Sequence, residues 1–293
     1  MPDSPAALPV PSKPPGTPGQ KALALGSRYG LRVVALGYLA VILAAPLALV
    51  FWNAFDDGFA AAWDAITTPA ALHALYLTVV IAAIAVPLNA IFGVMAALIL
   101  VRRRVPGKPL ISALIDLPLA LSPVVVGLAL VLVWGNTGWF GPAADDFGVQ
   151  VIFALPGMVL ATIFICLPFV VREVVPVLRE VGTEQEEAAA TLGSGAFTTF
   201  WRITLPAIRW GLIYGVVLTT ARALGEYGAV RVVSGSIAEK TQTLTLHVEE
   251  QYQSFDYVSA YSASVVLALL ALATVLVMNL LNRKDGVRGD HGH

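Results

Sequence analysis

Residues Leu75–Val101 read LYLTVVIAAIAVPLNAIFGVMAALILV, a run of 27 residues without a charged side chain. A helix that crosses the hydrocarbon core of a bilayer needs about 20 mostly apolar residues, because only internal hydrogen bonds can satisfy its backbone there. The run is long enough and apolar enough to cross. We therefore predict an all-α fold that is embedded in a membrane.

The composition of the whole chain agrees with this prediction. Of its 293 residues, 57% are hydrophobic types and 13% are charged, against about 45–50% and about 25% in soluble globular domains. These values argue against a single water-soluble domain. The formal net charge of -1 gives no basic field that would attract nucleic acid. The single cysteine, Cys166, excludes an intrachain disulfide and a multi-thiolate metal site.

Five further stretches have the length of a spanning helix, so we predict a polytopic protein with six transmembrane helices. Four of them are uncharged, and one of these four has Pro118 and Pro123 near its start. The fifth carries Arg222 and Glu226 in its second half. In chain order the six predicted spans are Val33–Phe55, Leu75–Val101, Leu117–Trp134, Val149–Val171, Ala207–Val233 and Tyr257–Leu281.

The charges of the connecting segments test this count, because lysine and arginine mark the cytoplasmic side of a membrane protein. With the N-terminus inside, 15 of the 18 basic residues fall on inner segments. The first two predicted outer loops contain aspartates and no lysine or arginine. Both termini are therefore predicted to be cytoplasmic.

The ends of the chain differ from its middle. Residues 1–20 contain seven prolines together with Gly, Ser and Thr, and such a segment buries too little apolar surface to fold. We predict a disordered cytoplasmic tail over 1–24, a transmembrane domain over 25–284 and a second cytoplasmic tail over 285–293. The first span has 23 residues, whereas the apolar region of a signal peptide has about 7–15, so we expect no cleavage.

The motifs of several enzyme classes are missing from the sequence. It contains no G-x-x-x-x-G-K-[ST], no H-E-x-x-H and no G-x-S-x-G, and its four histidines are scattered. We therefore expect no catalytic residue, no metal site and no cofactor in this chain.

The loop between the fourth and fifth predicted spans, residues 172–207, carries two short helical patterns. Thr183 and Glu186 have the spacing of a capping box. Gly193 should end the first helix, and a second helix should follow over Phe197–Leu205, with Pro206 as a stop or a new start. Two short helices joined by a glycine turn form either a docking surface or a solvated linker between two spans.

The same loop contains a long spaced pattern, made of Glu187, Ala188, Ala189, Gly193, Ile203, Leu205 and Pro206. In every fixed position it resembles the EAA motif of permease subunits of ABC importers. The resemblance implies the MetI-like fold of type I importers, with a coupling loop over 183–206 that docks in a groove of a separate ATPase. Glu187 and Gly193 would lie at that contact. The alanines would keep the helix slim, and the glycine would permit the turn.

The fifth predicted span contains an ion-pair pattern. Arg222 and Glu226 are four residues apart on one helix face, which Thr219 and Gly215 extend. A charge at the bilayer centre costs about 2.5–3.5 kcal/mol, so the pair should face the bundle interior, a cavity or the outer interface. It either fixes helix packing or lines an anion path together with Thr219, since the arginine fork suits tetrahedral oxyanions.

The stretch Ala221–Ala229, ARALGEYGA, resembles the corresponding stretch of sulfate and molybdate permeases. Residues Val232–Gly235 and Thr241–Glu249 narrow the resemblance to the W-type permeases of sulfate/thiosulfate importers, over about residues 25–285. The resemblance implies a non-catalytic subunit that translocates sulfate, and thiosulfate as well, across a bacterial inner membrane by alternating access.

The resemblance also implies a set of partners. These are a homologous T-type permease, two ATP-binding subunits that hydrolyse ATP, an external or periplasmic sulfate-binding protein that contacts the outer loop 234–256, and membrane lipid. Two alternatives stay open at this point. One is a permease for another oxyanion such as molybdate or tungstate, and the other is a membrane scaffold without a transport function.

Overall fold

The computed structural model describes residues 32–286, and every regular element in this range is a helix. The predicted all-α class is thus confirmed for the described residues. The predicted N-terminal tail (1–24) lies outside them, as does the predicted C-terminal tail except for residues 285–286, which continue the last helix. The chain divides into two compact units, residues 1–50 and 51–293.

The first unit contains most of the first predicted span. A helix runs over Arg32–Ala54 and includes the π-helical turn η1 (Ala40–Ala44) and the helix α2 (Ala45–Ala54), which crosses into the second unit. The structure therefore contains the first predicted span as one helix.

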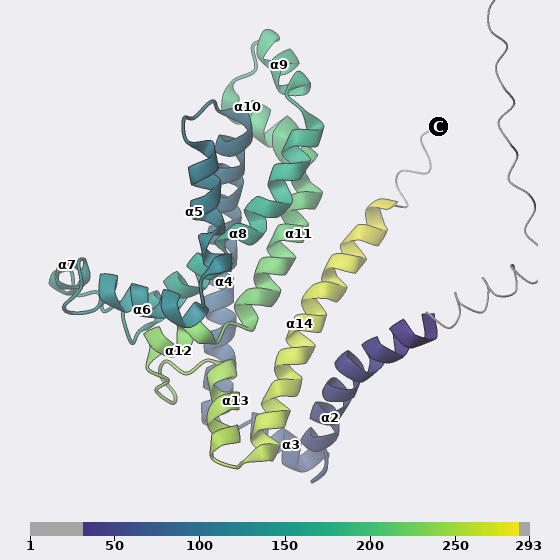
Figure 1. Ribbon diagram of the computed structural model, residues 1–293, viewed down its shortest axis with the longest axis vertical. Helices are drawn as coiled ribbons and strands as arrows, with labels where there is room; N and C mark the ends of the chain where they lie inside the picture. Colours follow the sequence, from purple (N-terminus) through teal and green to yellow (C-terminus); the bar gives the residue numbers. More distant parts are fainter. Residues whose placement is uncertain (1–31, 287–293) are drawn as a thin grey trace, which may run out of the picture. The chain divides into compact units, whose positions relative to one another are not determined.

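The second unit is built around three long helices, α4 (Pro69–Arg102), α8 (Leu155–Val181) and α11 (Leu205–Leu224). Helix α4 packs along α8, and α11 packs against both (Figure 1). Their approach is close because glycines face Val170 of α8. A Cβ atom on Gly93 would lie 2.6 Å from the Val170 Cβ, and one on Gly215 would lie 2.9 Å from the Val170 Cα.

The last helix, α14 (Tyr257–Gly286), packs against α11, α13 and α3. Shorter helical segments precede, separate or extend the long helices along the chain. They are α3 (Phe59–Ile66), α7 (Gly141–Asp146), α9 (Glu184–Thr191), α10 (Ala196–Thr199), the π-helical η2 (Phe200–Thr204), α12 (Gly228–Ser234) and α13 (Leu244–Gln253).

The third predicted span is not one straight helix. The chain forms α5 (Lys108–Ala120) and α6 (Pro123–Trp134), and its direction bends by 111° between them. Leu121 and Ser122 between them are extended, with ψ of 145° and 134°. The physical reason is Pro123, which disfavours the helical conformation of the residue before it and offers no N–H to a preceding turn.

The fifth predicted span also ends early. Helix α11 stops at Leu224, and the chain turns at Gly225 before α12 begins at Gly228. The second half of the predicted span is thus a separate short helix that packs against α6. The fourth predicted span is shifted, because α8 starts at Leu155 and continues to Val181. The described residues contain five helices long and apolar enough to cross, or six if the bent pair is one span.

Candidate coupling and translocation sites

The segment 183–206 protrudes from one end of the second unit (Figure 1). No residue of α9 is buried. The helix ends in a Schellman motif, in which the amide of Ser194 donates to the carbonyl of Ala189 and the amide of Gly193 to that of Ala190, both at 3.0 Å. Gly193 has φ +83°, which a residue with a Cβ adopts only with strain. The glycine turn predicted from the sequence is therefore present.

The predicted capping box is wrong. The Thr183 hydroxyl donates to the Glu187 carboxylate at 2.7 Å and caps no amide. Glu186 instead pairs with Arg102 at the end of α4, at 2.9 Å between Oε2 and Nε, and accepts from the Thr204 hydroxyl at 2.8 Å. A long-range cation outcompetes the local cap here, because a charge-assisted bond is about twice as strong as a neutral one.

Arg102 holds the base of the protruding segment. Its guanidinium donates to the carbonyls of Leu178 and Gly182, at 3.0 and 2.6 Å, in addition to pairing with Glu186. The end of α4, the end of α8 and the start of α9 are thus joined by one side chain.

The second half of the sequence pattern lies at the junction with the membrane helices. Ile203 and Leu205 are half-buried, and Pro206 is exposed in the first turn of α11. The helix does not stop at Pro206, because α10, η2 and α11 form one continuous helix over Ala196–Leu224. The predicted second short helix is therefore the beginning of the long helix that ends as α11 at Leu224.

The tip of the protrusion is apolar as well as charged. Glu187 and Ala188 are exposed and Ala189 is half-exposed. Leu192 and Phe197 are 88% and 78% exposed. The sequence pattern includes neither residue. The position of Leu192 next to the glycine turn is the signal that could have identified it. Large exposed apolar side chains beside acidic ones are typical of an interface.

The other candidate residues lie where two helices break. Arg222 in the last turn of α11 forms an ion pair with Glu226 at 2.7 Å, and the Glu226 side chain is 1% exposed. Because α11 has ended at Leu224, Glu226 lies in the turn beyond it. Its carboxylate also accepts from the amide of Ala229 at 3.0 Å and so caps the start of α12.

The break after α11 contacts the break between α5 and α6. A Cβ atom on Gly228 would lie 2.8 Å from the Cβ of Pro123, and one on Gly127 would lie 2.9 Å from the carbonyl oxygen of Ala229. Two interrupted helices therefore meet next to the Arg222–Glu226 pair.

Two polar side chains in this core lack partners. The Thr219 hydroxyl and both polar atoms of the Asn89 side chain are buried and have no hydrogen-bond partner among the described residues. Such groups are rare, because each unmet bond costs about 1–3 kcal/mol. Sequence reasoning missed Asn89, although an amide inside the apolar run 75–101 is a visible signal.

A polar cap closes the opposite end of the unit, within residues 231–256. The Thr78 hydroxyl of α4 accepts from the amide of Leu244 at 2.8 Å and so caps α13. Arg231 pairs with Glu249. His247 is buried, with Nδ1 3.4 Å from the Gln242 side-chain oxygen, and Gln242 donates in turn to Glu250.

Acidification should loosen this cap. Burial lowers the pKa of His247 below its usual 6.5, and the nearby carboxylates of Glu250 and Asp256 only partly oppose this. Since the unfolded state then binds more protons than the folded state, stability is full above pH 6.5 and falls below it, by at most about 1.4 kcal/mol per pH unit. Thermal unfolding of the purified protein from pH 7.5 to 5.5 should show a steeper loss than in His247→Gln. Equal slopes would contradict this assignment.

The described residues contain no group of three or more His, Cys, Asp or Glu side chains that could hold a metal ion. Cys166 is a buried free thiol.

Comparison with known proteins agrees with this architecture. Residues 89–284 match the family described as "Binding-protein-dependent transport system inner membrane component". The chain is 50% identical over 259 residues to the sulfate transport system permease protein CysW of Synechocystis sp., covering 88% of this chain and 94% of that protein. It is 37% identical over 251 residues to the sulfate transport system permease protein CysT of the same organism, covering 86% and 88%.

A solved structure shares the fold. It is a bacterial alginate ABC transporter in complex with an alginate pentasaccharide-bound periplasmic protein, with a TM-score of 0.74, 17% identity, and coverage of 90% of this chain and 96% of that one. This chain therefore belongs to the family of inner membrane components of binding-protein-dependent transport systems.

Proposed function

We propose that this chain is the permease subunit of an ATP-driven ABC importer that translocates sulfate across the inner membrane by alternating access. The observation that carries the proposal is the 50% identity, over 88% of this chain, to a sulfate transport system permease protein. The chain itself is non-catalytic, and a separate ATPase supplies the energy. Thiosulfate is proposed as a second substrate.

The coupling loop 183–206 docks with the ATPase. Glu187, Ala188, Ala189 and Gly193 form the docked tip, and Ile203, Leu205 and Pro206 join this tip to α11. The exposed side chains of Leu192 and Phe197 support this role, because water-exposed apolar groups of this size gain free energy when a partner covers them. Closure of two ATP-binding subunits would then move the helices as rigid bodies.

Thr219, Arg222 and Glu226 line the path of the anion. The support is their place at two interrupted helices, since transporters commonly bind substrates where helices are discontinuous. The guanidinium of Arg222 offers parallel donors to a tetrahedral oxyanion. Glu226 neutralises that charge when no anion is present.

The assembly includes a second, homologous permease and an external binding protein. Similarity to both CysW and CysT supports the permease pair. The outer cap, with α13 at its centre, is proposed as the contact with the sulfate-binding protein. The end of the bundle that carries the coupling loop must face the ATPase, so we place that end on the cytoplasmic side. The distribution of basic residues supports cytoplasmic termini as well.

Transport of another oxyanion, such as molybdate or tungstate, is the main alternative. Uptake of radiolabelled sulfate in the presence of each competing anion distinguishes the two functions. A strain without this chain should lose growth on sulfate and keep growth on cysteine. Growth on sulfate that is independent of the chain would contradict the proposal.

Charge reversal at Glu187 should uncouple the permease. Because Glu187 is exposed at the tip, Glu187→Arg should leave the amount of membrane-inserted protein unchanged. A misplaced charge at a docking contact costs several kcal/mol, so co-purification of the ATPase and sulfate uptake should each fall about tenfold or more. Glu184→Arg, an exposed carboxylate on the same helix outside the motif, is the matched control. Normal uptake in Glu187→Arg would leave only a scaffold function.

A further inference from the structure

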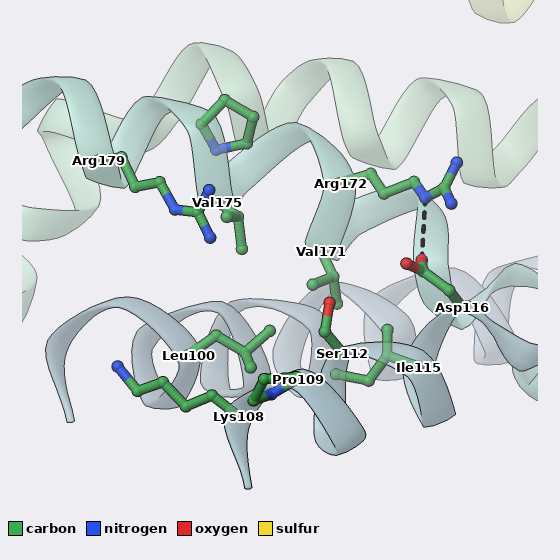
Figure 2. A pocket seen from close by; sticks show the side chains of 11 residues that line it. Leu100, Lys108, Pro109, Ser112, Ile115, Asp116, Val171, Arg172, Val175 and Arg179 are labelled. Carbon is green, nitrogen blue, oxygen red and sulfur yellow. Dashed lines mark hydrogen bonds and ion pairs between the residues drawn. The ribbon is translucent and has the colours of Figure 1, made fainter. Parts of the chain in front are cut away.

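A second polar site lies at the cytoplasmic end of the bundle, separate from the Arg222–Glu226 pair. A cavity of about 440 Å³ opens between the end of α4, the first half of α5 and the second half of α8. Figure 2 shows the Arg179 guanidinium reaching from α8 into this space and the Ser112 hydroxyl directed into it from α5. Leu100, Val171 and Val175 form apolar walls.

The charged side chains of the cavity form two facing stripes. On α5, Lys108, Ser112 and Asp116 are four residues apart and share one helix face. On α8, Arg172 and Arg179 are seven residues, or about 10 Å, apart on one face. In the sequence these cations are visible only as part of the basic inner segments, because their convergence depends on how α5 packs against α8.

The charges of the cavity do not balance. Arg172 donates to Asp116 at 2.9 Å (Figure 2). Lys108 and Arg179 form no ion pair with any residue over 32–286. The lining therefore carries an excess of two positive charges. Arg179 and Ser112 are exposed and Lys108 is half-buried, so these side chains are accessible to an anion from solvent, and the two charges attract one to the cavity.

The cavity is also connected to the coupling loop. Arg179 is three residues before Gly182, where α8 ends and whose carbonyl accepts from Arg102. A displacement of the coupling loop relative to α5 must change the width of the cavity, because α8 forms one wall and continues directly into that loop.

We propose that this cavity is a binding site for a tetrahedral dianion, which the translocated sulfate occupies before its release into the cytoplasm. The inference rests on the proposed sulfate transport. The excess of two positive charges matches sulfate, whereas a phosphodiester lipid headgroup carries a single negative charge. Arg179 and Lys108 bind the anion, Ser112 donates a hydrogen bond, and Arg172 stays paired with Asp116.

The test uses the complete permease–ATPase complex in nanodiscs without the external binding protein, with radiolabelled sulfate as the probe. Affinity measured by equilibrium dialysis should fall about tenfold or more in Lys108→Gln and in Arg179→Gln, as expected for loss of one charge-assisted contact. Arg179→Lys should keep part of the affinity. Arg104→Gln, an exposed cation of the same inner loop outside the cavity, is the matched control. Variants of Arg172 are avoided because they leave Asp116 unpaired.

Three outcomes would overturn the assignment. The cavity is not the sulfate site if Lys108→Gln and Arg179→Gln bind sulfate as tightly as the control. The same conclusion follows if the wild-type complex binds no sulfate. The third outcome comes from native mass spectrometry on nanodiscs with and without phosphatidylglycerol. If the variants lose bound lipid but keep their sulfate affinity, the cavity is a lipid site. Uptake by cells separates these failures from failure of the proposed function, since wild-type cells that import sulfate retain the function whatever the cavity binds.

Discussion

Replacement of Arg222 by alanine should abolish sulfate uptake and also lower the amount of folded protein. The Glu226 side chain is 1% exposed and paired with Arg222 at 2.7 Å, and removal of one partner of a buried ion pair destabilises a protein by about 3–5 kcal/mol. The double variant Arg222→Ala/Glu226→Gln removes both charges. Its glutamine can still accept from the amide of Ala229, so the folded protein should return while uptake stays absent.

Two measurements separate packing from transport here. Thermal unfolding of the purified permease reports stability, and radiolabelled sulfate uptake, normalised to the amount of membrane protein, reports transport. Co-purification of the ATPase should be normal in the double variant, because the coupling loop lies at the other end of α11. If uptake returns together with stability, the pair only fixes the packing of the broken helix, and the anion path lies elsewhere.

A methyl group at Gly93 or Gly215 should separate the three central helices. The new Cβ would lie 2.6 Å from the Val170 Cβ in one case and 2.9 Å from the Val170 Cα in the other, and overpacking of this kind costs about 1–3 kcal/mol. We expect both Gly93→Ala and Gly215→Ala to lower the unfolding temperature. Gly37→Ala, where nothing lies within 4 Å, should be neutral or stabilising because alanine favours a helix.

Val170→Gly distinguishes the two contacts. It removes the side chain that Gly93→Ala meets. The double variant Gly93→Ala/Val170→Gly should therefore be more stable than the summed stability losses of the two single variants predict. It leaves the Cα that Gly215→Ala meets, so no such rescue is expected there. Equal coupling for both pairs would mean that α8 shifts as a whole and that the glycines do not set its position.

Hydropathy and charge patterns were sufficient to predict the long helices, because a membrane-embedded backbone depends on the local run of apolar residues. They could not predict the bend at Leu121–Ser122, since a count of uncharged residues contains no information about the direction of the helix axis. Pro123 was a visible sign of a break, but the direction that α6 takes after the break also involves its packing against α12, a later segment of the chain.

The coupling loop shows a second kind of limit. The glycine turn at Gly193 follows from residues next to each other, and the sequence predicts it. The partner of Glu186 is Arg102, 84 residues away, and no local spacing indicates such a contact. The same holds for the cavity between α5 and α8, whose cations are brought together only by the packing of distant segments.

The continuity of the helix over Ala196–Leu224 has a mechanical consequence. At about 1.5 Å per residue its 29 residues extend over about 40 Å, so under the proposed function it would act as a lever with the docked tip at one end and Arg222 at the other. A pivot of about 5° would then displace the far end by about 3–4 Å, comparable to the diameter of a small ion. The π-helical turn at Phe200–Thr204 interrupts the regular α-helical hydrogen bonds near the loop end of this arm, and a soft turn there would pass less of each displacement on to Arg222.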